Sequence, residues 1–416
     1  MDAWGVLMLE EAEEIGRRAK RARLRLGKTQ ADLAAEMGRT QGWVSKMERG
    51  LIELDRVGLL NKLAAELHIH PNDLIGRPYS SSVAENQWQT AASAIVRELR
   101  RFDLVPVFDG TPRRSRVLWG EMTRLHRLRD AAANVAILRS LPDMLREARA
   151  LAEVSAGRER EEAFALYGVM CKFAHTAAHS LGHPELAAMA CERAAWAGRL
   201  SADPVLAAVA DWMRAWDMWA TADWDDSLAV LDKALLGLER YYDQGDPLAV
   251  RAWGSLHLRA AVSAARAGKP DASNDRIAHA KMAGDRMDEE TGPLVYDRHS
   301  LTFSSGNVAI HAVSVALEVG DQRRALDLNA RMDPSVVTVL PNSRQGYHHL
   351  DLARAWLWDG NRDKSLAELE RAEQLAPQLV RNHPIARSTL RSIVYAERAS
   401  TRERLRSMSD RFHLDG

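Results

Sequence analysis

The sequence lacks several features that would mark a disulfide-stabilised, metal-bound or membrane-spanning protein. Its 416 residues include two cysteines, Cys171 and Cys191, which are too few for a disulfide framework or a cysteine-based zinc site. No apolar run approaches the roughly 18 residues that cross a bilayer. The first residues, MDAWGVLMLEEAEE, lack the basic region that opens a signal peptide. We therefore expect a cytoplasmic protein with no membrane partner.

Motifs that mark common enzyme classes are missing as well. The chain has no Walker phosphate loop, dinucleotide-binding fingerprint, nucleophile elbow or His-Glu-x-x-His motif. Gly268-Lys269-Pro270 lacks the upstream glycine of a Walker loop and has proline where Ser or Thr belongs. These absences predict that the protein is not an enzyme and needs no cofactor.

Three histidines spaced four residues apart raise the question of a metal site. His175 and His179 would share one helix face, as metal ligands can. His183 follows Gly182 and precedes Pro184, so it lies beyond the end of that helix. Since the sequence places no carboxylate beside them, we expect these histidines to be structural or solvated, with no metal bound.

The net charge is zero, but basic residues are concentrated near the N-terminus. The segment IGRRAKRARLRLGK, residues 15–28, contains seven basic residues and no acidic ones. A compact basic segment in a neutral protein indicates either a solvated helix face or a local anionic partner.

The next segment, KTQADLAAEMGRTQGWVSKMERG, predicts two short helices joined by a tight turn. Thr29 and Asp32 have the spacing of a capping box, Gly38 suits the left-handed residue that ends a helix, and Thr40 can cap the second helix. Apolar residues follow at helical spacing in both helices: Leu33, Ala34 and Met37, then Val44 and Met47. This is the helix-turn-helix arrangement.

Three further helices complete a small core. The first helix of the domain covers 15–26, and the fourth carries an apolar stripe. A short fifth helix opens at Pro71 and continues to Ile75. The stripe consists of Leu59, Leu60, Leu63, Ala64 and Leu67.

Residues 13–77 resemble the Xre/Cro-type helix-turn-helix family of bacterial and phage regulators. The resemblance rests on TQADLAAEMG, TQGWVSKMERG and LAAELHIHPNDLIG. It implies a five-helix, lambda-repressor-like domain in which Gln30 reaches a phosphate and Thr40 caps the recognition helix. It also implies that Gln41 reads base edges, that Ser45 and Lys46 make further contacts, and that Glu48 is structural.

Elementary chemistry agrees with this assignment. Gln pairs with adenine through two hydrogen bonds, and Lys46 can reach guanine or a phosphate. Basic side chains around Arg23 would add salt-dependent affinity for DNA. Gly42 provides no reading side chain, and Trp43 either presses on a thymine methyl or sugar or packs against the following loop. The predicted DNA-binding residues are Gln30, Thr40, Gln41, Trp43, Ser45, Lys46 and Arg49, with Arg17, Arg21 and Lys28 on the basic flank.

After residue 77 the chain changes character. RPYSSS predicts a linker over 78–84, which follows a DNA-binding domain over 1–77. Helical patterning then continues through a repeat domain over 85–400, and a tail covers 401–416. Five places repeat an Ala-rich helix, a tight turn and a second helix, with turn points at Gly182, Asp223, Gly268, Gly320 and Gly360.

The spacings between these turns, 41, 45, 52 and 40 residues, exceed the 34 residues of a tetratricopeptide repeat. Their small residues and turns still resemble divergent tetratricopeptide repeats, which implies an all-α fold with a right-handed solenoid. Polar residues on the first helix of each pair would line its concave face, where Asn can clamp a peptide backbone and Arg can bind a carboxylate. The candidate ligand-binding residues, with Arg259 beside them, are Lys172, His175, Arg214, Asp217, His257, Asn307, His311, Tyr347, His348 and Arg354.

This layout resembles actinobacterial regulators and the peptide-sensing quorum regulators of Gram-positive bacteria. The resemblance implies a transcription regulator that binds a palindromic operator in double-stranded DNA as a homodimer. It also implies that the repeat domain dimerises and senses a small peptide or other effector. The alternative is a repeat domain that serves as a protein-interaction scaffold and has no small ligand.

Overall fold

The computed structural model describes residues 3–52, 54, 57–69, 73–74, 83–290 and 297–395, together with 405, 408–409 and 411–412. Within these residues the regular structure is helical and no strand occurs, as the all-α prediction requires. The N-terminal domain contains α1 (Ala3–Arg25), α2 (Gln30–Met37), α3 (Gln41–Glu48) and α4 (Val57–Glu66).

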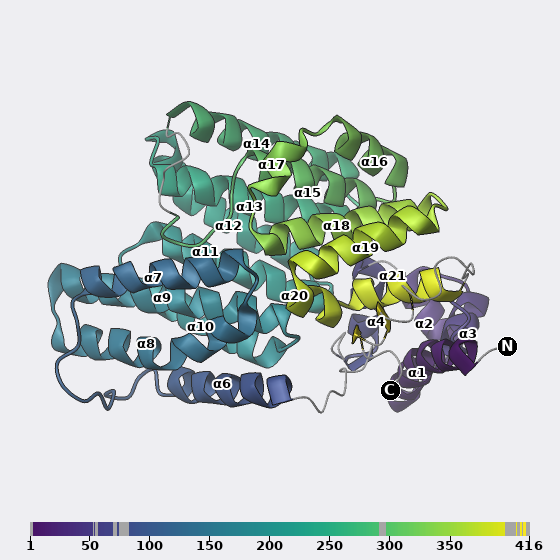
Figure 1. The fold of residues 1–416 in the computed structure, drawn as a ribbon, viewed down its shortest axis with the longest axis horizontal. Coiled ribbons are helices and arrows are strands. Elements are labelled where there is room, and N and C mark those ends of the chain that lie inside the picture. The colour runs from purple at the N-terminus through teal and green to yellow at the C-terminus, as the bar shows by residue number, and fades with distance from the viewer. Residues whose placement is uncertain are drawn as a thin grey trace.

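The remaining helices form the repeat domain (Figure 1). They are α6 (Val83–Arg100), α7 (Ser115–Asp130), α8 (Asn134–Val154), α9 (Gly157–Ser180), α10 (Pro184–Leu200), α11 (Pro204–Asp217), the 3-10 helix η1 (Met218–Thr221), α12 (Trp224–Asp243), α13 (Pro247–Arg266), α14 (Pro270–Glu290), α15 (Ser305–Glu318), α16 (Gln322–Arg331), α17 (Pro334–Thr338), α18 (Asn342–Trp358), α19 (Arg362–Leu375), α20 (Pro377–Asn382) and α21 (Pro384–Tyr395).

Local capping fixes the two helices of the helix-turn-helix unit. The Thr29 side chain accepts a hydrogen bond from the Asp32 amide at 3.1 Å, and the Asp32 carboxylate accepts one from the Thr29 amide at 2.7 Å. Gly38 ends α2 with a φ of 63°, a left-handed conformation that glycine adopts without strain. The Thr40 side chain then caps α3 by accepting from the Trp43 amide at 3.2 Å. The predicted capping box, turn and second cap are thus confirmed.

The predicted fifth helix lies mostly outside the described residues. Asp73 and Leu74 are helical, and Leu74 is fully buried in the core of the N-terminal domain. The predicted linker also lies largely outside them, although α6 already begins at Val83.

The repeat domain consists of antiparallel helix pairs whose turns fall at the predicted points. Gly182, Gly268, Gly320 and Gly360 each separate two helices and have a left-handed φ between 73° and 90°. In the remaining pair the left-handed residue is Ala222, directly before Asp223. Short turns bring the two helices of a pair side by side, so their apolar stripes face each other.

One small buried residue recurs where the helices of a pair cross. In three pairs it is a serine in the first turn of the second helix, and its hydroxyl donates to an alanine carbonyl twelve residues earlier on the first helix. These bonds join Ser227 to Ala215, Ser273 to Ala261 and Ser365 to Ala353. Ala187 and Ala325 occupy the corresponding place in two other pairs, and all five side chains are fully buried. A small residue here lets the two helices approach closely.

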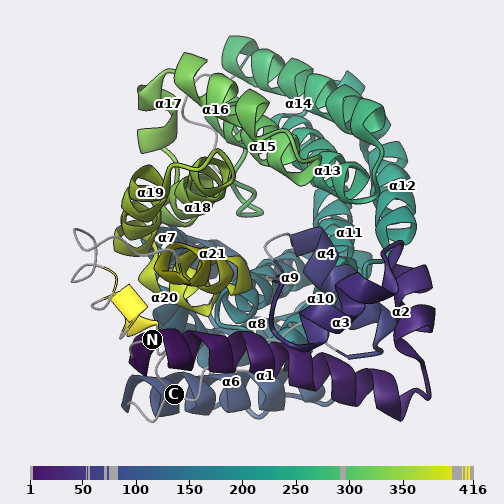
Figure 2. The ribbon, with the colours of Figure 1, turned by 90° about the vertical axis from the view of Figure 1, so that its right-hand side faces the viewer.

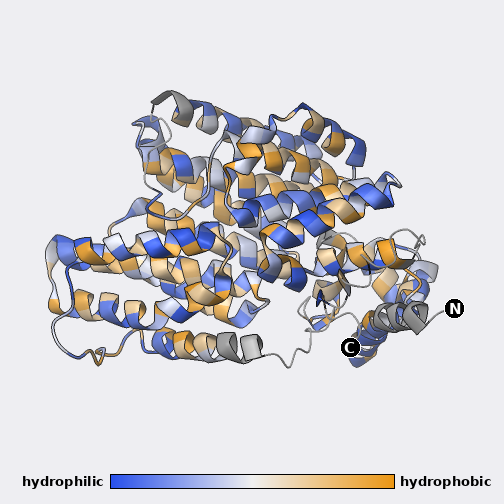
Figure 3. Cartoon of the chain, viewed as in Figure 1, coloured by the Kyte–Doolittle hydropathy of each residue, from blue (hydrophilic) through white to orange (hydrophobic). Residues whose placement is uncertain are grey.

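The helix pairs follow a curved path around the molecule, and in the view of Figure 2 α4 lies inside this curve. Along each helix hydrophobic residues alternate with hydrophilic ones (Figure 3), as expected when one stripe packs against a neighbour. Leu405, Met408 and Phe412 are buried in one cluster with residues of α19 and α21. The core of the repeat domain therefore extends past the predicted boundary at residue 400.

A glycine sets the distance between α1 and α3. A Cβ atom at Gly16 would lie 2.4 Å from the carbonyl oxygen of Glu48 and 2.7 Å from that of Met47. Only a residue without a side chain allows this approach, because the neighbouring atoms belong to the backbone of α3.

We expect Gly16→Ala to lower the free energy of unfolding by about 1–3 kcal/mol, since overpacking forces the backbone to move. The measurement is denaturant unfolding of the full chain followed by circular dichroism. Gly120→Ala in α7 is the matched control, because a Cβ there meets no atom within 4 Å; we expect it to gain about 0.5–1 kcal/mol from helix propensity. Equal gains for both variants would contradict the close contact.

Candidate nucleic-acid interface and repeat cavity

Helix α3 presents polar side chains to solvent at the edge of the molecule. Gln41, Lys46 and Arg49 are exposed, and Thr40 is exposed at the amino end of the helix. In Figure 1 α3 lies at the side away from the repeats, and in Figure 2 it faces the viewer. The amino end of a helix also carries partial positive charge, which favours approach to phosphates. The surface predicted to enter a DNA groove is therefore open.

The carboxylate of Glu48 holds α3 in place. Arg23 on α1 donates to Glu48 through Nε at 2.5 Å and through Nη2 at 3.1 Å, and the two side chains are 6% and 2% exposed. Gln30 at the start of α2 donates its amide to the same carboxylate at 2.8 Å. Arg23 also donates to the Lys28 carbonyl at 2.7 Å. Arg23 thus belongs to the domain core rather than to the basic surface, which corrects the sequence analysis.

The remaining predicted DNA contacts lie around α3. Arg17 and Arg21 on α1 are exposed, while Lys28 is half-buried and donates to Glu36 and to the Glu66 carbonyl, both at 2.8 Å. Trp43 is half-buried against the core of the N-terminal domain. Ser45 is half-buried, and its carbonyl accepts from Arg49 Nε at 3.1 Å. Of the two interpretations of Trp43, packing is the one that this position favours.

The repeat domain encloses a cavity of about 330 Å³, here called the repeat cavity. Residues of α7 to α11, η1, α13, α15, α18, α20 and α21 line it, together with Asn61 of α4. The Asn61 amide donates to the carbonyl oxygen of Trp219 in η1. The N-terminal domain therefore contacts the repeat domain at the rim of this cavity.

Six of the ten predicted ligand-binding residues line the repeat cavity. They are Lys172, Asn307, His311, Tyr347, His348 and Arg354. The other four lie in the surrounding structure: Arg214 pairs with Asp211 at 3.4 Å, His257 stacks on His279 with ring centroids 4.9 Å apart, and His175 and Asp217 bond to each other.

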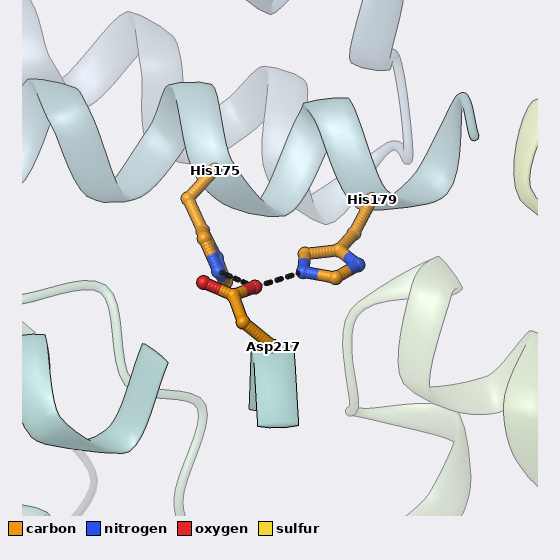
Figure 4. A group of neighbouring side chains, drawn as sticks. All are labelled: His175, His179 and Asp217. Atoms are coloured by element: carbon orange, nitrogen blue, oxygen red, sulfur yellow. Dashed lines mark hydrogen bonds and ion pairs between the residues drawn. The ribbon is translucent and has the colours of Figure 1, made fainter. Parts of the chain in front are cut away.

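His175, His179 and Asp217 join α9 to the end of α11 (Figure 4). One oxygen of Asp217 lies 2.9 Å from Nε2 of His175 and 2.7 Å from Nε2 of His179, and Trp216 stacks on the His179 ring at 4.3 Å. Burial lowers the pKa of His175 to about 4, so its ring is neutral at pH 7 and donates to the carboxylate. The donor atoms lie within 4.8 Å of one another, as metal ligands would. Both hydrogen bonds go to the same oxygen of Asp217, and the structural role of the histidines stays our prediction.

Cationic groups outnumber carboxylates around the repeat cavity. Among the described residues that line it are the arginines Arg129, Arg259, Arg266, Arg344 and Arg354, and the carboxylates Glu318 and Asp351. Lys172 lines it too, but burial lowers its pKa well below the usual range. Three of the lining histidines are neutral at pH 7. Burial lowers the pKa of His311 and His383 to about 3 and that of His348 to about 4. The wall is electropositive through its arginines.

Several lining residues were missed by the sequence analysis. Arg344 lies one turn before Tyr347 on the first helix of its pair, so the helical period could have identified it. Asn61 comes from the other domain, and no pattern in the sequence indicates its place. Trp212, Trp216 and Trp219 also line the cavity.

Comparison with known proteins identifies the N-terminal domain. Residues 14–74 match a family described as a helix-turn-helix domain. A search of curated proteins finds no match. Among solved structures, Bacillus thuringiensis PlcR in complex with the peptide PapR7 and DNA is similar at 14% identity, covering 66% of this chain and 95% of that one. Its TM-score is 0.27, too low to carry an argument about function. None of the described helices is long and apolar enough to span a membrane.

We expect Glu48→Ala to lower the free energy of unfolding by about 3–5 kcal/mol, because it leaves the Arg23 guanidinium buried without its partner. Denaturant unfolding of the full chain measures the loss. The double variant Arg23→Met, Glu48→Leu removes both charges and should be clearly more stable than Glu48→Ala. A Glu48→Ala protein as stable as the wild type would show that the pair does not hold α3.

The burial of His257 predicts acid sensitivity of the repeat domain. Burial, with the charge of Arg276, lowers its pKa to about 3, whereas the unfolded chain titrates at 6.5. Below pH 6.5 the unfolded state binds the proton first, so stability falls as pH falls, by about 2 kcal/mol per such group at pH 5. We expect His257→Phe to lose less thermal stability than the wild type when the pH falls from 6.5 to 5. An identical slope in the variant would contradict the assignment.

Proposed function

We propose that this protein is a sequence-specific transcription regulator that binds a palindromic operator as a homodimer. The repeat domain mediates dimerisation and binds a short peptide or other small effector in the repeat cavity. The helix-turn-helix domain performs the DNA recognition.

One observation carries the proposal: α3 is fixed by buried contacts yet exposes Gln41 and Lys46. Glu48 ties the base of the helix to α1 and α2, while the opposite side faces solvent. A rigid helix with an open polar face can enter the major groove, where Gln matches adenine and Lys reaches guanine or phosphate. Two such helices in a dimer would contact half-sites about 34–36 Å apart.

The contact between α4 and η1 supports a role for the repeat cavity in regulation. Trp219 forms part of the cavity wall, and its carbonyl accepts from Asn61 of the helix-turn-helix domain. An effector that shifts Trp219 would change how the two domains are held together. A coupling free energy of about 1–3 kcal/mol is enough to change operator occupancy.

We expect the double variant Gln41→Ala, Lys46→Ala to bind its operator at least about tenfold more weakly, because each base contact contributes about 1–3 kcal/mol. The operator is first obtained by selecting tight-binding duplexes from a random pool with the wild-type protein. Binding is then measured by fluorescence anisotropy over a range of salt concentrations. Loss of the Lys46 contact should reduce the salt slope by about 1.

Arg323→Ala, an exposed change on α16, is the matched control and should bind DNA as the wild type does. Selected duplexes should contain an inverted repeat, and sedimentation should give two chains per duplex. Unchanged operator binding by the double variant would remove α3 as the reading element. A pool that yields no common sequence would remove sequence specificity.

A further inference from the structure

Arg259 lies at the wall of the repeat cavity without a charged partner. Its side chain projects from α13 and the residue is 8% exposed. The guanidinium carbon lies 3.8 Å from the ring centre of Trp212 and 4.7 Å from those of Trp216 and Trp219. Within the described part of the chain the guanidinium makes no hydrogen bond or ion pair, and its Nε is buried without an acceptor.

A second arginine faces the same cavity from another repeat. Arg344 belongs to α18, and no described residue accepts a hydrogen bond from its guanidinium. The charges of both arginines act on the same imidazole, since burial, Arg344 and Arg259 together lower the pKa of His311. Tyr347, which lines the cavity on the same helix as Arg344, adds a hydroxyl that can donate to an anion.

The carboxylates near these arginines are paired with other groups. Glu318 lies 3.4 Å from Arg266 and 3.5 Å from Arg354, and Asp351 lies 3.0 Å from Arg354. Asp217 accepts from the two histidines of Figure 4. The Arg129 guanidinium forms an ion pair with Asp297 at 3.2 Å and donates to the Ser300 hydroxyl at 2.6 Å. Among the described residues no carboxylate therefore forms an ion pair with Arg259 or Arg344, although the charge of Asp217 acts on Arg259 from a greater distance.

We propose that the repeat cavity binds an organic anion whose carboxylate or phosphate pairs with Arg259 and Arg344. The flat apolar part of this ligand packs against the tryptophan wall of the cavity.

Electrostatics and shape favour this class of ligand. A buried charge without a counter-charge is unfavourable, and an anion in the cavity would offset that cost. The planar guanidinium offers paired donors that match a carboxylate or phosphate. Trp212, Trp216 and Trp219 line the cavity, so the parts of their rings that Arg259, Arg266 and His179 leave open give it apolar surface. A cavity of about 330 Å³ lies within the size range of sites for small molecules.

This inference deepens the proposed function by naming the chemistry of its effector. It concerns binding to the repeat domain alone, so its experiment uses no DNA. Failure of the anion site leaves DNA recognition by α3 untouched, and failure of DNA binding leaves the anion site standing.

The test compares three probes of similar shape: naphthoate, naphthyl phosphate and the neutral naphthamide. Binding to the full-length protein is measured by calorimetry and by the fluorescence of the cavity tryptophans. We expect at least one of the two anions to bind about tenfold or more tightly than naphthamide. The better anion tells whether the natural group is a carboxylate or a phosphate.

Variants then locate the site. Arg259→Gln and Arg344→Gln should each weaken the better anion about ten- to a hundredfold, as expected for loss of a charged hydrogen-bonding partner. Naphthamide binding should change little. Arg344→Gln keeps the result interpretable if Arg259→Gln fails to fold, and Arg323→Gln is an exposed control that should bind as the wild type does. Equal binding of charged and neutral probes, no binding at millimolar concentration, or unchanged anion binding by Arg344→Gln overturns the proposal.

Discussion

The position of the recognition helix depends on one buried carboxylate. Glu48 lies at the end of α3 and accepts hydrogen bonds from Arg23 on α1 and from Gln30 on α2. A buried carboxylate is costly unless it is paired, so the arrangement of these three helices is the one that satisfies it. Gly16 allows α1 to approach the same end of α3. The exposed face of α3 can carry polar, weakly packed side chains because its other face is fixed in this way.

The helices of the repeat domain depend on one another, since none of them can bury its apolar stripe alone. Left-handed turns fold each helix back on the next, and small residues at the crossing points, such as Ser227 and Ala325, allow close packing. Stacking the pairs along a curve leaves a wall of polar and aromatic side chains around the repeat cavity. Packing therefore produces the cavity as a consequence of curvature, and the side chains that line it are then available for binding.

The DNA-binding domain contacts the repeat domain at η1, beside the repeat cavity. Asn61 of α4 donates to the carbonyl of Trp219, whose indole donates to Ser263 at 2.8 Å, and Ser263 shares a hydrogen bond with Ser227. Arg259 and Arg266 lie over the Trp219 ring. The 3-10 helix η1 thus contacts three features: the wall of the repeat cavity, the crossing point at Ser227, and helix α4 of the DNA-binding domain.

Local patterns in the sequence determined the helices, their caps and the turns of the repeats. Thr29, Gly38 and Thr40 are recognisable because capping and left-handed turns depend on residues only a few positions apart, and the exposed residues of α3 follow from the same period. The partners that lie far apart in sequence were decided by the tertiary structure. The Arg23 side chain lies in the core because folding brings Glu48 to it, and His175 and His179 meet Asp217 because α9 packs on α11. The unpaired state of Arg259 likewise depends on which carboxylates other side chains have already bound, and that is settled only when distant helices pack.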